Sequence, residues 1–120
     1  MLRVLLLYRM EITFGSTKLE KTFNSDSFLQ REYGQEMAKK IKARMAVLRA
    51  APSLALVPTA KPDRCHPLTG NRAGQFAVDL QHPFRLIFEP DADSLPKKED
   101  GGIDLEQVVS VRILGVEDYH

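Results

Sequence analysis

The sequence has no tryptophan and only one cysteine among its 120 residues. A lone cysteine, Cys65, cannot form a disulfide within the chain, which predicts a protein of the reducing cytoplasm. No apolar stretch approaches the roughly 20 residues that a membrane-spanning helix needs, and residues 1–8 lack the features of a secretory signal. The three histidines show no metal-ligand spacing, so neither a metal nor another cofactor is expected.

The chain also has almost no net charge, but its charges are unevenly distributed. Residues 1–74 carry 13 lysines and arginines against 6 acidic residues, whereas residues 75–120 carry 4 against 10. A basic half could bind nucleic acid, or the acidic half could neutralise it within the fold. The length predicts one domain, residues 10–120. Residues 1–9 are either an N-terminal extension or an additional edge strand.

The first half of the domain is predicted to contain one strand and three helices. Residues 11–14 alternate as a half-buried strand does, and helical patterns cover residues 18–23, 28–33 and 35–51. In the third helix an apolar stripe predicts the buried face: Met37, Ile41, Met45 and Leu48. Its other faces carry the basic residues Lys39, Lys40, Lys42 and Arg44, which are either simply solvated or contact RNA.

The second half is predicted to form strands. Residues 64–68 begin this half, and residues 75–80, 84–89 and 108–116 alternate with the period of two typical of strands. Phe84, Leu86 and Phe88 are expected to face inward. Each of the other two strands places three apolar side chains on one face: Phe76, Val78 and Leu80, and Val109, Val111 and Ile113. Residues 90–107 form an acidic loop. The order of elements predicts an α+β fold in which the N-terminal strand and the helices pack on a small antiparallel sheet.

Two residues of the second half are candidates for chemistry on a phosphate. His66 can act as a general acid or base, or it is a structural histidine at a strand end. Its neighbour Cys65 is not expected to pair with it, because adjacent strand residues face opposite ways. Arg85 can hold a phosphate and stabilise its developing charge, or it forms an ion pair with Asp79 or Glu89.

Further candidates lie in a loop and on the last strand. Arg72, in a glycine-rich loop, and Arg112 either bind phosphate or are only solubilising. The sequence ends in Asp118, Tyr119 and His120, directly after a predicted strand that would deliver all three to one edge of the sheet. A carboxylate there can orient an imidazole, and a tyrosine can stack on a nucleobase. Asp118 is otherwise a solvated charge, and Tyr119 a cover for the core.

Three segments, taken in order, carry a family resemblance. Residues 64–79 (RCHPLTGNRAGQFAVD), 83–88 (PFRLIF) and 118–120 (DYH) resemble the HigB branch of the RelE/ParE toxin superfamily. The resemblance covers residues 10–120, although Thr69 stands where relatives often carry a lysine. It implies a RelE-like fold and a toxin of a type II toxin–antitoxin system that inhibits translation. Such a toxin is an endoribonuclease that enters the ribosomal A site and cuts mRNA without a metal.

In that reaction the ribose 2′-OH attacks the adjacent phosphate and leaves a 2′,3′-cyclic phosphate. The resemblance implies that His120 or His66 transfers protons and that Arg85 stabilises the phosphate charge. It also implies that Asp118 orients His120 or helps to remove a proton, and that Tyr119 holds the nucleobase.

The resemblance also implies partners. These are the ribosome with bound mRNA and a cognate antitoxin of the helix-turn-helix type, through which the chain would meet operator DNA only indirectly. An exposed strand edge or the basic helix 35–51 is the expected docking surface for the antitoxin. Two other functions stay open: a ParE-like toxin that binds DNA gyrase, and a catalytically degenerate member that only binds its antitoxin.

Overall fold

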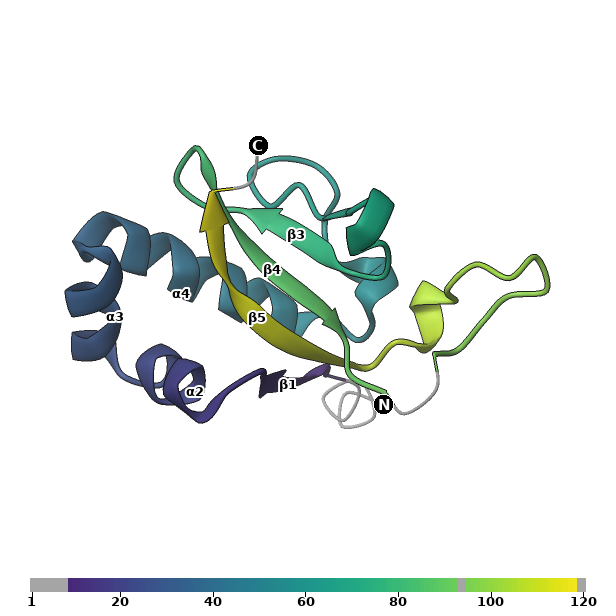
Figure 1. The fold of residues 1–120 in the computed structure, drawn as a ribbon, viewed down its shortest axis with the longest axis horizontal. Coiled ribbons are helices and arrows are strands. Elements are labelled where there is room, and N and C mark those ends of the chain that lie inside the picture. Colours follow the sequence, from purple (N-terminus) through teal and green to yellow (C-terminus); the bar gives the residue numbers. More distant parts are fainter. Residues whose placement is uncertain (1–8, 93–94, 119–120) are drawn as a thin grey trace.

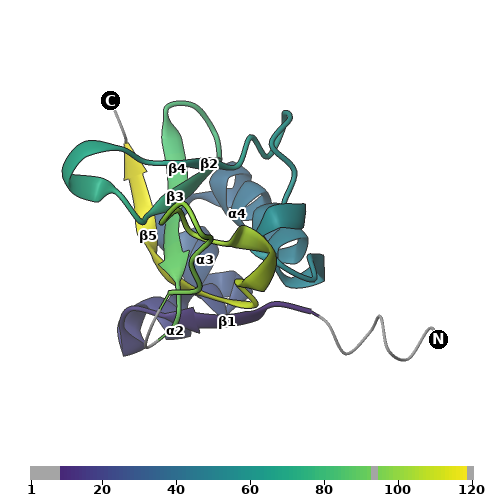
Figure 2. The ribbon, with the colours of Figure 1, turned by 90° about the vertical axis from the view of Figure 1, so that its right-hand side faces the viewer.

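A layer of helices covers one face of a five-stranded sheet (Figures 1 and 2). The computed structural model describes residues 9–92 and 95–118, so most of the 1–9 segment and the candidates Tyr119 and His120 lie outside the described residues. The predicted α+β class is confirmed. Within the described residues no helix is long and apolar enough to cross a membrane.

The elements follow the predicted order closely. They are β1 (Glu11–Phe14), α2 (Thr17–Phe23), α3 (Asp26–Tyr33), α4 (Gln35–Ala50), β2 (His66–Pro67), β3 (Phe76–Asp79), β4 (Phe84–Pro90) and β5 (Ser110–Asp118). Short 3₁₀ turns occupy Leu54–Leu56, Gly70–Arg72 and Leu105–Gln107.

Local capping explains where the helices begin. The Ser16 hydroxyl accepts a hydrogen bond from the Leu19 amide at 3.1 Å, and the Ser25 hydroxyl accepts one from the Phe28 amide at 3.2 Å. Gly34 then separates α3 from α4 with a φ of +85°, a conformation that glycine adopts without steric cost. The three helices can therefore follow one another with almost no loop between them.

The sheet is mixed, which corrects the expectation of a purely antiparallel one. Its strand order is β1-β5-β4-β3-β2. The pairs β2–β3, β3–β4 and β4–β5 are antiparallel, but β1 runs parallel to β5. Parallel neighbours need a long connection. Here that connection is all of the chain between Phe14 and Ser110, helices included.

The last strand begins and ends two residues later than predicted. Val108 is buried, but its amide donates to the Leu105 carbonyl at 3.3 Å and its carbonyl accepts from the Leu54 amide at 3.0 Å, so its backbone bonds to the two 3₁₀ turns. Val109, predicted to share a face with Val111 and Ile113, is exposed, whereas those two are buried. At the other end the polar pair Glu117 and Asp118 continues the ladder opposite Arg85 and Phe84. Asp118 therefore lies within the strand and not after it.

The two faces of the sheet have different surroundings. One face carries Val78, Leu86 and Ile113, which pack in one core cluster with Ile41 and Leu48 of α4. Phe84, expected in this core, is 37% exposed because it lies at the start of β4. The other face has only a small apolar patch, and the rest of it carries charged residues. The patch consists of Leu68, Ala77 and Ile87, with Leu114 packed against it.

The revised start of β5 predicts unequal effects for two valine substitutions. Val111 is 0% exposed and Val109 is 54% exposed. We expect Val111→Ala to lower the free energy of unfolding by about 2 kcal/mol, from two lost methyl groups and the cavity they leave. Val109→Ala should change it by less than about 0.5 kcal/mol. Urea titrations of both variants test this, and equal losses would contradict the assigned strand.

Candidate active site

The charged face of the sheet gathers several candidate side chains around Asp79, the last residue of β3. Strand register explains how, since Asp79 lies opposite Arg85 on β4, and His66 on β2 lies opposite Ala77. Residues directly opposite one another project to the same face, as do residues two apart along a strand. His66, Asp79 and Arg85 therefore share the face that the helices leave uncovered.

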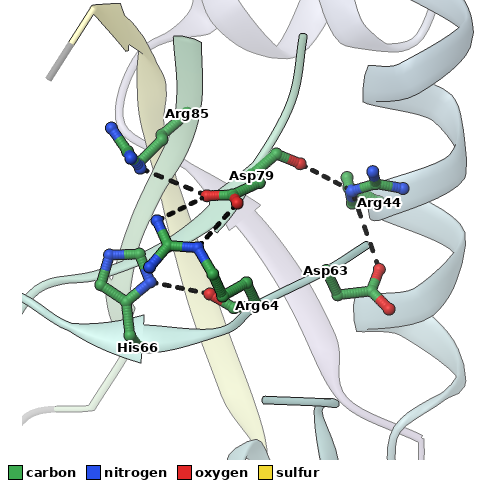
Figure 3. Close-up of polar contacts among 6 residues, drawn as sticks. All are labelled: Arg44, Asp63, Arg64, His66, Asp79 and Arg85. Atoms are coloured by element: carbon green, nitrogen blue, oxygen red, sulfur yellow. Dashed lines mark hydrogen bonds and ion pairs between the residues drawn. The ribbon is translucent and has the colours of Figure 1, made fainter. Parts of the chain in front are cut away.

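Two guanidinium groups hold the Asp79 carboxylate (Figure 3). Arg64 donates from Nε to Oδ2 at 2.7 Å and from Nη2 to Oδ1 at 3.0 Å, a bidentate arrangement. Arg85 donates from Nε to Oδ1 at 3.2 Å. The Arg85 side chain is 17% exposed and that of Arg64 is 35% exposed. Of the two roles predicted for Arg85, the ion pair with Asp79 is thus present.

The cations control the ionisation of Asp79. Burial by itself would raise the pKa of this carboxyl group. The hydrogen bond from Arg64 opposes that effect, together with the charges of Arg64 and Arg85 and a smaller contribution from His66, so the pKa is lowered. Asp79 is therefore an anion at neutral pH, and its two arginines leave the cluster with a net positive charge.

The position of the proton on His66 follows from its contact with Arg64. His66 Nδ1 lies 2.7 Å from the Arg64 backbone carbonyl (Figure 3). A carbonyl only accepts hydrogen bonds, so Nδ1 carries the hydrogen, and Nε2 of the neutral ring has the lone pair. Arg64 has a φ of +47°, a strained conformation for a residue with a side chain. This conformation orients its carbonyl to His66 while its guanidinium binds Asp79.

Arg44 does not lie on a solvated face as the sequence suggested. It is 8% exposed, and its Nε donates to the Asp79 backbone carbonyl at 2.6 Å. Its Nε also lies 3.7 Å from Asp63 Oδ1, beyond hydrogen-bond range. Arg44 therefore anchors β3 to α4 from the core side. A phosphate could reach it only if these contacts broke.

Arg72 and Glu117 join the glycine-rich loop to the end of β5. Arg72 donates from Nη1 and Nη2 to the two Glu117 carboxylate oxygens at 2.7 and 2.8 Å, and from Nε to Gln75 Oε1 at 2.9 Å. The hydrogen bond from Arg72 outweighs burial and lowers the pKa of Glu117. Glu117 faces Arg85 across the ladder, so Arg72 reaches the same end of the sheet as the Asp79 cluster.

Asp118 follows Glu117 and pairs with Phe84 at the start of β4. Because side chains alternate along a strand, it points to the face opposite that of Arg85. Strand geometry thus argues against direct contact between Asp118 and a phosphate held by Arg85.

Arg112 lies elsewhere on the sheet. It donates from Nη2 to Asp91 Oδ1 at 2.6 Å and lies 3.4 Å from Glu89 Oε2. The Thr13 hydroxyl also donates to Asp91. Glu117 lies five positions after Arg112 on β5, a distance of about 16 Å along an extended strand. Arg112 and Arg85 therefore cannot hold the same phosphate.

The lysines predicted to bind RNA are exposed on α4 and distant from the charged sheet face. Lys39 lies 3.7 Å from Glu36, and Lys42 lies 3.2 Å from Asp26. Lys40 is also exposed. Since α4 covers the core face of the sheet, these residues form a separate surface.

Two residues of this site, Arg64 and Asp79, were not among the predicted functional residues. Asp79 was predicted only as a possible ion-pair partner of Arg85. Arg64 was named only as the first residue of the segment 64–79 that carries the family resemblance. Strand alternation gave a signal for Asp79, since it continues the face of Ala77. Arg64 lies before β2, and no periodicity indicates where its side chain points.

In the described part of the chain, no three histidine, cysteine, aspartate or glutamate side chains are grouped so as to hold a metal ion. The cluster instead offers an imidazole nitrogen beside two guanidinium groups. Such a set can accept a proton and stabilise negative charge on a phosphate.

Comparison with known proteins gives a relationship at the level of the fold. A scan against protein-family models found no match, and a search of curated proteins found none either. Among solved structures, a YoeB/ParE toxin from Agrobacterium tumefaciens is similar with a TM-score of 0.55 and 14% identity, over 92% of this chain and 100% of that one. A chain of a YoeB-YefM complex from Staphylococcus aureus is similar with a TM-score of 0.50 and 16% identity. The match covers 93% of this chain and 98% of that one. This chain therefore has the YoeB/ParE-type toxin fold.

The lowered pKa of Asp79 predicts a pH-dependent effect of its substitution. A depressed folded-state pKa contributes stability that is present at neutral pH and lost as the pH falls through that pKa. We expect Asp79→Asn to lower the free energy of unfolding by about 1–3 kcal/mol at pH 7, because two guanidinium groups lose their anion. At pH 3 the difference from wild type should shrink, because this pH lies below the pKa of about 3.9 that an aspartate has in the unfolded chain, so the stabilisation is already being lost.

Urea titrations at both pH values test this expectation. Asp26→Asn is the matched control, because Asp26 forms only an exposed ion pair and its loss should cost less than about 1 kcal/mol. A difference for Asp79→Asn that stays constant from pH 7 to pH 3 would contradict the assigned ion pairs.

Cys65 should be inert in the folded protein. Burial, aided by the nearby charge of Asp63, raises the pKa of the Cys65 thiol to about 11. At pH 8 only about one thiol in a thousand would then be ionised, and the thiolate is the reactive form. We expect Ellman's reagent to modify Cys65 rapidly in urea and at least about a hundredfold more slowly in buffer. Equal rates would show that the thiol is accessible.

Proposed function

We propose that this protein is the toxin of a type II toxin–antitoxin pair, a HigB-like endoribonuclease that cuts ribosome-bound mRNA and so acts in the cytoplasm. The observation that carries the proposal is the arrangement of His66, Arg64 and Arg85 on the uncovered face of the sheet. The sequence resemblance and the YoeB/ParE-type fold support it independently.

The proposed reaction needs proton transfer and charge stabilisation but no metal. His66 Nε2 accepts the proton of a ribose 2′-OH, whose oxygen then attacks the adjacent phosphorus. The bond from phosphorus to the 5′-oxygen of the next nucleotide breaks, and that oxygen leaves as a hydroxyl after gaining a proton. A 2′,3′-cyclic phosphate remains. Arg85 and Arg64 oppose the negative charge that develops on the phosphorane oxygens.

The remaining roles belong to the end of the chain. His120 would donate the proton to the leaving 5′-oxygen, Tyr119 would stack on a base, and Asp118 would orient His120. Support for this assignment comes from Asp118, which ends β5 one residue after the Glu117–Arg72 ion pair. That ion pair ties the end of β5 to the loop beside the cluster.

The partner protein in this proposal is an antitoxin. A similar fold occurs in a toxin that was solved as a YoeB-YefM complex, which supports the idea that this chain also binds a protein inhibitor. A helix-turn-helix antitoxin would connect it to operator DNA, and the ribosome with its mRNA would be the target once the antitoxin is lost.

The ion pair between Arg85 and Asp79 favours a second candidate, a member of the fold that binds its antitoxin without cutting RNA. In that case the guanidinium groups serve only to hold the sheet together. The two candidates differ in whether catalysis depends on His66, whose side chain makes no comparable ion pair among the described residues.

Expression in bacteria, with primer extension on the extracted mRNA, tests the nuclease. We expect translation arrest and cuts at ribosome-occupied codons, with ends that carry a 2′,3′-cyclic phosphate. His66→Asn keeps a donor toward the Arg64 carbonyl but removes the base, so cleavage should fall by about 10²–10⁴-fold. Arg85→Ala should cause a loss of about 10²-fold or more.

His82→Asn is the matched control, since His82 is an exposed imidazole in the turn between β3 and β4. It should cut like wild type. Arrest that persists in His66→Asn and Arg85→Ala would rule out this mechanism, and gyrase inhibition without RNA cleavage would indicate the ParE-like function. Normal growth with intact antitoxin binding would favour the second candidate.

A further inference from the structure

A groove between α2 and α3 lies apart from the charged sheet face. These two short helices follow one another at one end of the molecule, within the helical layer (Figure 1). The groove has a volume of about 510 Å³, which is within the range of ligand-binding clefts. Lys18 and Lys21 line it from α2, and Phe28, Arg31 and Glu32 line it from α3.

Helical spacing brings these side chains to the groove. Lys18 and Lys21 are three residues apart, as are Phe28 and Arg31, so each pair lies on one face of its helix. Leu29 is turned into the core at 1% exposure, whereas its neighbour Phe28 remains 43% exposed. The partly exposed ring of Phe28 gives the groove an apolar surface against which a partner side chain can pack.

The charges of the groove are unbalanced. Among the described residues, neither Lys18 nor Lys21 forms an ion pair, whereas Lys39 and Lys42 on α4 each have a carboxylate nearby. Arg31 packs over the ring of Phe28, with its guanidinium carbon 5.3 Å from the ring centroid. Three cations thus surround the groove against one carboxylate, that of Glu32.

We infer that the α2–α3 groove is the docking site of an acidic, amphipathic protein segment. An apolar side chain of the segment packs against Phe28 and the hydrocarbon stems of the lysines. Carboxylates on either side of it face Lys18 and Lys21 on one wall and Arg31 on the other. The 7-residue α2 and the 8-residue α3 are each about 11 Å long, so they cover about two turns of a helical partner.

The groove suits a peptide better than a nucleic acid. Nucleobases bind by stacking on an open aromatic face, but Arg31 already covers one face of the Phe28 ring. Glu32 would repel a phosphate backbone, whereas a peptide can place an apolar side chain beside it. The inference does not depend on nuclease activity, because it uses no residue of the Asp79 cluster.

A titration of the ¹⁵N-labelled full chain, followed by NMR, tests the inference. The probe is the acetylated acidic peptide EELLEELLEELL, and the comparison probes are its Lys-for-Glu counterpart and an eight-nucleotide single-stranded RNA. We expect the acidic peptide to shift amide signals of α2 and α3. Raising the salt to 0.5 M should weaken its binding.

Variants then separate the groove from general charge attraction. Lys18→Glu/Lys21→Glu should raise the Kd for the acidic peptide about tenfold or more, and so should Phe28→Ala. Lys39→Glu/Lys40→Glu is the matched control with the same change in net charge, and it should raise the Kd less than about threefold. All of these residues are exposed, and circular dichroism verifies folding.

Three results would overturn the inference. One is an absence of shifts in α2 and α3, and another is equal weakening in the two double variants. The third is binding of the RNA or of the basic peptide to the same amides as tightly as the acidic peptide. These outcomes are distinguishable from failure of the nuclease proposal, which the RNA cleavage assay decides.

Discussion

The contacts of Asp79 tie the parts of the structure together. Its carboxylate is held by Arg64 and Arg85, its carbonyl accepts from Arg44 of α4, and its amide donates to the Asp63 carbonyl at 2.8 Å. One residue thereby joins β3 to β4, to the helical layer and to the segment before β2. In such a partly buried network each charge depends on the others, because removing one partner leaves the rest unsatisfied.

Sequence patterns predicted the elements whose burial is periodic. The stripe around Ile41 and the alternation of Phe76 and Val78 follow from geometry alone, and all three side chains are buried. Arg44 shows the limit of this reasoning, since a charged residue is assigned to a surface unless its buried partner is known. The ion-pair partner of Arg85 could not be chosen from the sequence either, because both predicted partners, Asp79 and Glu89, are close to it along the chain. Only the pairing of β3 with β4 shows that Asp79 lies opposite Arg85.

The uneven distribution of charge along the chain is partly resolved by folding. Arg64 and Arg72, from the basic half, pair with Asp79 and Glu117 of the acidic half. These pairs support the interpretation that the acidic half neutralises the basic half within the fold. The cations of the α2–α3 groove come from the same basic half but lack such pairs, which is why the imbalance persists at that surface.

The ion pairs of Asp79 restrict how any phosphate could bind beside it. Asp79 accepts from the Nε and Nη2 atoms of Arg64 and from the Nε atom of Arg85. One carboxylate between two guanidinium groups leaves the cluster with a net positive charge, which would attract a phosphate. Asp79 would then act by holding both cations in place before the substrate arrives, which removes part of the entropic cost of assembling the site. A site with so few groups would depend on its target to position the RNA, as a ribosome does when it holds mRNA in a fixed register.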